Sequence, residues 1–193
     1  KFERNWIVKQ RIQNRQPLGF QGFAMNMRRP PFDDLRVRKA MAHLLDRDRM
    51  NRTLMYGQYF LQRSYFEDLY DQERPCTNEF FDFNKDKAKA LLKEAGWKVN
   101  PDTGLLEKGG RPFTFSFLER DQSAEKFLAI YGDDLRDAGI QMKIEKKDWA
   151  AWAKDMEQFN YDMTWAAWSA GLFKDPEDMW DSKEAARTGG NNI

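Results

Sequence analysis

The stretch Phe113-Thr114-Phe115-Ser116-Phe117 alternates apolar and polar side chains strictly, which is the pattern of a β-strand. Apolar residues then recur at helical spacing over 123–138, and residues 140–144 alternate again as a second strand. A further helix can begin after the N-cap candidate Asp148, and residues 161–168 have the composition of a third strand. An order of strand, helix, strand, helix, strand is typical of parallel strands joined by right-handed crossovers. We therefore predict an α/β fold.

Two further helices are expected earlier in the chain. The first begins after Asp34, because apolar residues recur from 37 to 45 at helical spacing. The second begins after Asn84 and ends at Gly96, where a left-handed C-terminal residue is favoured. The other expected elements are strands at 23–27 and 105–107, a short helix at 49–56 and a helix that starts at Pro176. At 193 residues the chain has the length of one domain, so we predict a single domain over 1–193.

The charges of the chain nearly cancel, because 32 Lys and Arg are balanced by 31 Asp and Glu to a net charge of +1. This balance gives no broad attraction to nucleic acid. The basic stretch 28–39 is interrupted by two aspartates, which favours a solvated helix face. Apolar runs are too short for a membrane-spanning helix. Lys1 is not an initiator Met and no signal peptide is visible, so we expect a fragment of a longer protein.

Residues that carry enzyme chemistry are sparse in this sequence. His43 is the only histidine and Cys76 the only cysteine, so the usual components of a metal site or a nucleophile and base pair are missing. We expect structural roles for both residues, no metal and no cofactor. Asp175 and Glu177 could be imagined as a hydrolase pair, but such pairs face each other across about 5–10 Å and near neighbours on one loop rarely do. A solvated turn is the favoured interpretation.

Tryptophans mark the end of the last predicted strand. Alternation places Trp165 and Trp168 on opposite faces of the sheet. Because ligands of open α/β sheets lie beyond the carboxyl ends of parallel strands, Trp168 is a candidate ligand platform, with a core position as the alternative. Trp149 and Trp152 lie three residues apart on the preceding helix and are expected to serve as packing residues.

Four stretches of the sequence carry a resemblance to a known family. They are Pro31-Phe32-Asp33-Asp34-Leu35-Arg36-Val37-Arg38-Lys39-Ala40, with Met25-Asn26 before it and Leu45-Asp46-Arg47 after it; residues 86–97; the strand after Gly110; and Tyr161-Asp162-Met163 leading into Trp168. In this order they resemble the family 5 extracellular solute-binding proteins, which include the oligopeptide and dipeptide binders. Residues 25–31 and 53–60 most resemble the microcin-C-type peptide-binding subgroup.

The resemblance implies a type II periplasmic-binding-protein-like lobe with a mixed sheet and flanking helices. The chain would correspond to most of the second lobe of a larger two-lobed protein, and the first lobe would be a partner outside this sequence. The implied function is the capture of peptides or peptide-like solutes between the lobes, followed by docking on an ABC transporter permease. A periplasmic or extracellular location follows from the same resemblance, and no catalysis is implied.

The resemblance also implies where the ligand binds. In the oligopeptide binders, a Trp-x-x-Asp-Tyr segment supplies an aromatic wall and an aspartate that pairs with the α-ammonium of the ligand. This sequence keeps the tryptophan and has glycine at the position of the aspartate, and Asp175 is a nearby substitute. The predicted ligand-binding residues are Trp168, Ser169, Ala170, Gly171 and Asp175. Two other functions stay open: a carboxylate-dependent hydrolase working through Asp175 and Glu177, and a protein-interaction module with an aromatic surface.

Overall fold

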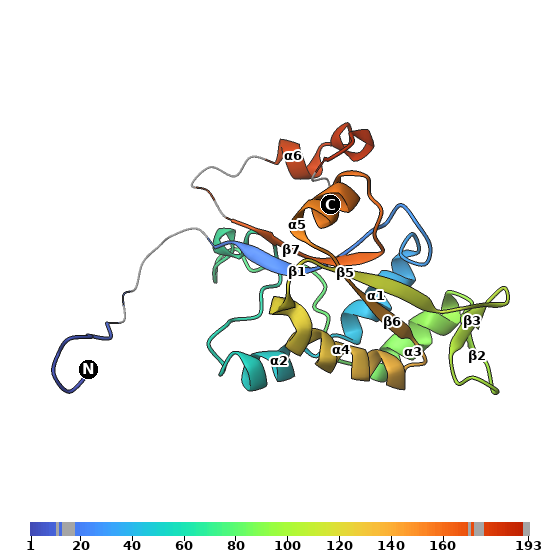
Figure 1. Ribbon diagram of the computed structural model, residues 1–193, viewed down its shortest axis with the longest axis horizontal. Coiled ribbons are helices and arrows are strands. Elements are labelled where there is room, and N and C mark those ends of the chain that lie inside the picture. Colours follow the sequence, from blue (N-terminus) through green and yellow to red (C-terminus); the bar gives the residue numbers. More distant parts are fainter. Residues whose placement is uncertain (11, 13–17, 170, 172–175, 191–193) are drawn as a thin grey trace.

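A four-stranded mixed sheet forms the centre of the protein in the computed structural model, which describes residues 1–10, 12, 18–169, 171 and 176–190 (Figure 1). The strands lie in the order β1 (Phe20–Met25), β7 (Met163–Trp168), β5 (Thr114–Glu119) and β6 (Gln141–Lys146). β5 pairs in parallel with both β6 and β7, whereas β1 pairs antiparallel with β7. The predicted α/β class with a mixed sheet is confirmed.

Two helices connect the parallel strands. α4 (Glu125–Asp137) joins β5 to β6, and α5 (Trp149–Glu157) joins β6 to β7 on the other side of β5. Right-handed crossovers that run in opposite directions along a sheet place their helices on opposite faces. In Figure 1, α4 lies on one side of the sheet and α5 on the other. The strand and helix order predicted from residue 113 onward is therefore correct.

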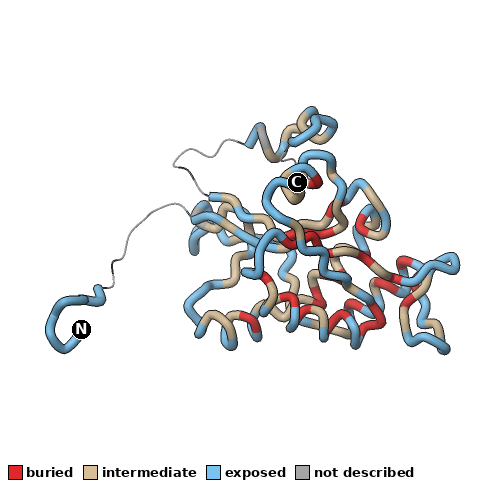
Figure 2. The backbone as a smooth tube through the Cα atoms, in the orientation of Figure 1, coloured by how far each residue is buried: buried red, intermediate tan, exposed pale blue. Residues whose placement is uncertain are grey.

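Helices α1 (Leu35–His43), α2 (Arg47–Leu54) and α3 (Lys85–Glu94) lie on the same side of the sheet as α4 (Figure 1). Their starts follow the predicted caps, since the side chain of Asp34 accepts a hydrogen bond from the Arg36 backbone N–H and that of Asn84 accepts one from Lys87. α1 packs against α3, and α2 packs against α4. Most of the largest fully buried side chains belong to this layer and to the adjacent sheet face, among them Phe32, Phe113, Phe117, Met41, Leu44, Leu92, Leu128 and Leu135. Figure 2 shows the buried segments concentrated between the sheet and these helices.

Several boundaries differ from the sequence prediction. The strand expected at 23–27 occupies Phe20–Met25, because its register is set by antiparallel pairing with β7. The strand expected at 105–107 is β3 (Leu106–Lys108), the centre of a small sheet with β2 (Lys98–Val99) and β4 (Arg111–Pro112). Neither flanking strand was predicted, because two residues are too few for a periodic pattern.

The remaining elements are short. They are the 3-10 turns η1 (Glu67–Leu69), η2 (Gln122–Ala124) and η3 (Glu184–Ala186), and the helix α6 (Glu177–Trp180), which follows Pro176 as predicted. Within the part of the chain that the structure describes, no helix has the length and apolar character needed to cross a membrane.

Candidate ligand-binding site

A crevice of about 290 Å³ lies at the carboxyl ends of β5 and β7. It exists because the last pairs between these strands are Phe117 with Met163 and Leu118 with Thr164, so β7 continues past the paired part of β5. The free length of β7 faces the segment that leads from β5 into α4. The lining residues are Phe117 to Asp121, Ser123, Ala124, Trp152, Met156 and Thr164 to Trp168. This is the edge of the sheet at which a ligand was predicted.

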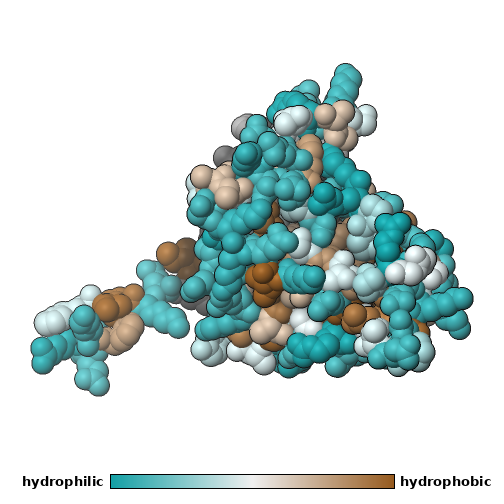
Figure 3. Space-filling model, turned by 45° about the vertical axis from the view of Figure 1, so that its right-hand side comes forward, coloured by the Kyte–Doolittle hydropathy of each residue, from teal (hydrophilic) through white to brown (hydrophobic). Residues whose placement is uncertain are grey.

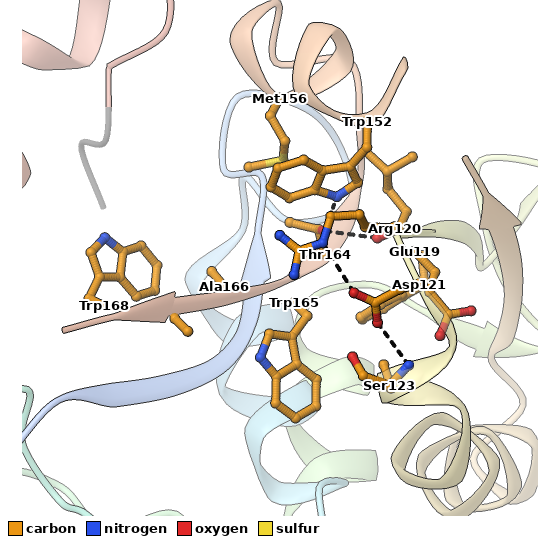
Figure 4. Close-up of a pocket in the computed structure, with 14 residues that line it drawn as sticks. Glu119, Arg120, Asp121, Ser123, Trp152, Met156, Thr164, Trp165, Ala166 and Trp168 are labelled. Carbon is orange, nitrogen blue, oxygen red and sulfur yellow. Dashed lines mark hydrogen bonds and ion pairs between the residues drawn. The ribbon is translucent and has the colours of Figure 1, made fainter. Parts of the chain in front are cut away.

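The two tryptophans of β7 have different environments. Trp165 lies on the α4 face, where its ring contacts those of Phe23 and Phe127. Trp168 lies on the α5 face and stacks on Phe20 of β1, with ring centroids 4.8 Å apart and an interplanar angle of 21°. The predicted placement on opposite faces is confirmed. Because Phe20 covers one face of the Trp168 ring, the ring is held in place while it also lines the crevice (Figure 4).

A chain of hydrogen bonds fixes the helix side of the crevice. The indole N–H of Trp152 donates to Thr164 Oγ1 at 3.2 Å, and the Thr164 hydroxyl donates to the Leu118 carbonyl oxygen at 2.8 Å. Thr164 is fully buried, so these hydrogen bonds are shielded from water at their shared residue. Trp152 is thus both a packing residue, as predicted, and a lining residue of the crevice, which was not predicted. Trp149 packs against Trp152, with ring centroids 5.4 Å apart, but the residue is 61% exposed, so this contact lies at the surface and not in the core.

Two charged residues follow β5 at the edge of the crevice. Arg120 Nε donates to Asp121 Oδ2 at 3.2 Å, and Asp121 Oδ1 accepts a hydrogen bond from the backbone N–H of Ser123. These hydrogen bonds, first from Ser123 and then from Arg120, lower the pKa of Asp121. The Arg120 guanidinium also lies over the rings of Trp149 and Trp152, 5.0 and 5.4 Å from their centroids. The sequence reasoning missed this pair because its residues lie in a turn with no periodic signal.

Glu119 is the last residue of β5 and is only 3% exposed. Neither of its carboxylate oxygens has a hydrogen-bond partner in the described part of the chain. Burial raises its pKa, while the positive charge of Lys146 acts in the opposite direction. A buried carboxylate of this kind is unusual, because buried polar groups are nearly always paired.

Comparison with known proteins identifies the family. The model of the bacterial extracellular solute-binding proteins, family 5 (middle region), matches residues 3–190. The chain belongs to family 5. Its members are binding proteins, and the mixed sheet with helices on both faces agrees with that assignment. The likeness to the microcin-C-type subgroup stays a prediction.

The family 5 relatives are longer than this chain. The protein y4wM of Sinorhizobium fredii is 30% identical over 205 residues, which cover 89% of this chain and 31% of that protein. The probable peptide-binding protein YejA of Agrobacterium fabrum is 28% identical over 206 residues, covering 90% of this chain and 34% of that protein. The structure of the oligopeptide-binding protein AppA of Bacillus subtilis in complex with a nonapeptide superposes with a TM-score of 0.81 at 24% identity, covering 92% of this chain and 36% of that one. This chain therefore spans about a third of the length of the relatives that it matches.

The predicted ligand-binding residues of this family 5 chain divide into two groups. Trp168 lines the crevice. Ser169 and Gly171 follow the end of β7 and are exposed. Ala170 and Asp175 lie outside the described residues, so their predicted roles, including the substitution of Asp175 for the missing aspartate, stay predictions. The same holds for a hydrolase pair of Asp175 with Glu177.

The single histidine and the single cysteine of the sequence have ordinary surroundings. His43 is buried, and its Nδ1 lies 2.7 Å from the Asp82 carbonyl oxygen, which agrees with a structural role. Cys76 is a half-buried free thiol. Among the described residues, no group of His, Cys, Asp and Glu has the arrangement of a metal site.

Proposed function

We propose that this chain forms one wall of the ligand cleft in a substrate-binding protein of an ABC importer, and that the ligand is a peptide or a peptide-like solute. The chain would act as a single domain, the second of two lobes, with the first lobe supplied by another part of the same protein. In this role it binds and releases its ligand without chemical conversion. The protein would work in the periplasm or outside the cell and deliver its ligand to a membrane permease.

The observation that carries this proposal is the position of Trp168 in a family 5 chain. Its ring lies at the carboxyl edge of the parallel strands, is held by Phe20 and borders a crevice large enough for a peptide unit. Rigid aromatic side chains supply contact area at a low entropic cost. The name of the Agrobacterium relative describes peptide binding, which supports the choice of ligand class.

The alternative of an interaction module with an aromatic surface has less support. On the face drawn in Figure 3, apolar side chains form small separate areas among hydrophilic ones. Protein interfaces of ordinary affinity need a broader contiguous surface.

The proposal is tested with the product of the complete gene and a library of random pentapeptides, with bound peptides identified by native mass spectrometry. We expect one or more peptides to bind, and Trp168→Ala to weaken the tightest of them about tenfold or more, the usual effect of removing an aromatic anchor. Trp168→Phe retains a ring for the stack on Phe20 and is expected to keep most of the affinity. Val99→Ala, an exposed site on β2 far from the crevice, is the matched control. A gene product that binds no pentapeptide would contradict the proposed function, and unchanged affinity in Trp168→Ala would contradict the assignment of the site.

A further inference from the structure

A second pocket, of about 450 Å³, lies at the start of α2, in the helical layer that shares one side of the sheet with α4 (Figure 1). It shares no lining residue with the crevice at the ends of β5 and β7. Its volume is in the range of small-molecule sites, which are mostly apolar with a few well-placed polar groups. We call it the α2 pocket, and its apolar lining residues are Leu45, Leu61, Phe80, Phe81 and Phe83.

Arg47, the first residue of α2, contributes a half-buried guanidinium to the α2 pocket. Its Nη1 donates to the Gln62 carbonyl oxygen at 3.0 Å, and its Cζ lies 5.6 Å from the ring centroid of Phe80. Among the residues that the structure describes, no carboxylate forms an ion pair with it. Burial lowers the pKa of Arg47, as expected for a cation without a counter-ion. Because a guanidinium has five N–H donors, most of them remain available to a ligand.

The three carboxylates that line the α2 pocket already have partners. Asp46 caps α2 by accepting a hydrogen bond from a backbone N–H of the helix at 2.9 Å. Asp48 forms an ion pair with Arg52, and Asp82 Oδ1 lies 3.4 Å from Lys87 Nζ. The charge that lacks a partner in this pocket is therefore positive, which is unusual because buried charges are normally paired.

Phe80 lies beside a second guanidinium. Arg63 Cζ is 5.0 Å from the centroid of the Phe80 ring, and this exposed side chain forms no ion pair with any described residue. Two cations over the same ring repel each other, and an anion bound beside that ring would offset both charges. The Phe80 residue is 42% exposed, so its ring is accessible to a ligand.

We propose that the α2 pocket binds a small amphipathic carboxylate, whose charged group pairs with Arg47 and whose aromatic or aliphatic group lies against Phe80 and Phe83. This site is separate from the crevice and goes beyond the proposed function. Guanidinium and carboxylate can form two parallel hydrogen bonds, which are shorter and stronger than neutral ones. An apolar group covering the phenylalanine rings adds buried area and shields the ion pair from water.

The test uses the complete gene product and the probe 4-(4-fluorophenyl)butyrate, followed by fluorine NMR. We expect a dissociation constant of about 1 mM or lower, which is typical of a ligand of this size. The matching amide, which has the same ring and no charge, should bind at least about tenfold more weakly. Acetate has the charge without the ring and should not displace the probe at equal concentration. Equal affinities for acid and amide, or no binding of the acid, would overturn the proposal.

Arg47→Gln locates the carboxylate. This variant should lower the affinity for the acid to that of the amide and leave the affinity for the amide unchanged. Arg111→Gln makes the same substitution at an exposed position of β4, in the small sheet at the other end of the molecule, and should change neither affinity (Figure 1). Equal losses for acid and amide in Arg47→Gln would mean that the guanidinium does not pair with the carboxylate.

Phe80→Ala tests the apolar part of the site without depending on the fold, because its side chain lies at the surface. It should weaken the acid and the amide by the same factor, about tenfold, while the melting temperature is retained. Phe2→Ala removes an exposed ring outside the pocket and serves as the control. Trp168→Ala, in the crevice, should leave the affinity for the acid unchanged. Loss of acid binding in Trp168→Ala, or full affinity in Phe80→Ala, would place the probe elsewhere and overturn the α2 site, while peptide binding in the crevice would be unaffected.

Discussion

The two faces of strands β1 and β7 differ sharply, although they are built from alternate residues of the same segments. On the α4 face, Phe23 contacts Phe117, Tyr131 and Trp165, with ring centroids 5.1 to 5.7 Å apart. On the α5 face, the corresponding positions of β1 and β7 are the pairs Phe20 with Trp168, Gly22 with Ala166, and Ala24 with Thr164. One face is filled with large rings, and the other alternates small residues with a single aromatic stack.

This contrast indicates a division of roles within one pair of strands. Successive side chains of a strand point to opposite faces, so one segment can stabilise the fold with one set of residues and shape a site with the other. Substitutions on the α4 face should therefore act mainly on the free energy of unfolding. Those on the open part of the α5 face should act mainly on ligand affinity.

The largest effect is expected for Phe117→Ala on the α4 face. Phe117 is fully buried, and its removal should lower the free energy of unfolding by about 3–5 kcal/mol through lost transfer energy and the cavity left behind. Ile144, its partner on β6, is 44% exposed, so Ile144→Ala should cost much less. Chemical denaturation of both variants measures the difference. Similar losses in the two variants would mean that burial beneath α4 does not determine the contribution of Phe117 to stability.

A smaller effect is expected for Thr164→Val, where the two roles meet. Valine keeps the shape of Thr164 but removes the hydroxyl that joins the Trp152 indole to the Leu118 carbonyl. Leaving these groups without their partner should cost about 1–2 kcal/mol of stability. Because Trp152 also loses its anchor, peptide affinity should fall as well. Thr114→Val, at a more exposed position of β5, should change neither quantity by a measurable amount. Loss of stability without loss of affinity would mean that Thr164 stabilises the fold but does not contribute to ligand binding.

The elements that determine the contrast between the two faces were accessible from the sequence. Strict alternation over 113–117 predicted β5, and the caps Asp34, Asn84 and Asp148 marked the starts of three helices correctly. These features depend on local spacing, which a single sequence displays directly. The opposite orientations of Trp165 and Trp168 followed from the same alternation.

Other parts of the site depend on contacts that local spacing does not encode. Arg120 became a candidate only through its stacking on Trp149 and Trp152, which lie about 30 residues later in the chain. The position of Gly22 opposite Ala166 follows from the antiparallel pairing of β1 with β7, which joins segments far apart in the sequence. The exposure of Trp149 was not predicted, because helical spacing says which residues share a face, but not whether another element covers that face.

The smallest expected effect concerns Glu119, whose position on β5 aligns it with the apolar residues Phe115 and Phe117 of the α4 face. It is the one buried residue on that side of β5 that carries a charge, at the edge where the core meets the crevice. Burial raises its pKa, the charges of Glu125 and Asp121 act in the same direction, and the positive charge of Lys146 opposes them. A raised pKa means that the folded state binds the proton more tightly than the unfolded state does.

The sign of the pH dependence follows from this difference. Between the ordinary pKa of a glutamate and the raised value, the folded state carries more protons, so the contribution of Glu119 to stability falls as the pH rises. At pH 7.5, Glu119→Gln should therefore stabilise the protein by less than about 1 kcal/mol. This gain should shrink as the pH falls toward the ordinary pKa of a glutamate side chain. Melting temperatures across this range measure the trend, with Glu145→Gln on the exposed face of β6 as the control. A variant that is less stable than the unmodified protein at pH 7.5 would mean that the charged carboxylate is favourable where it lies. The α4 face would then include a polar contact at its edge, and the apolar, stabilising part of that face on β5 would end before Glu119.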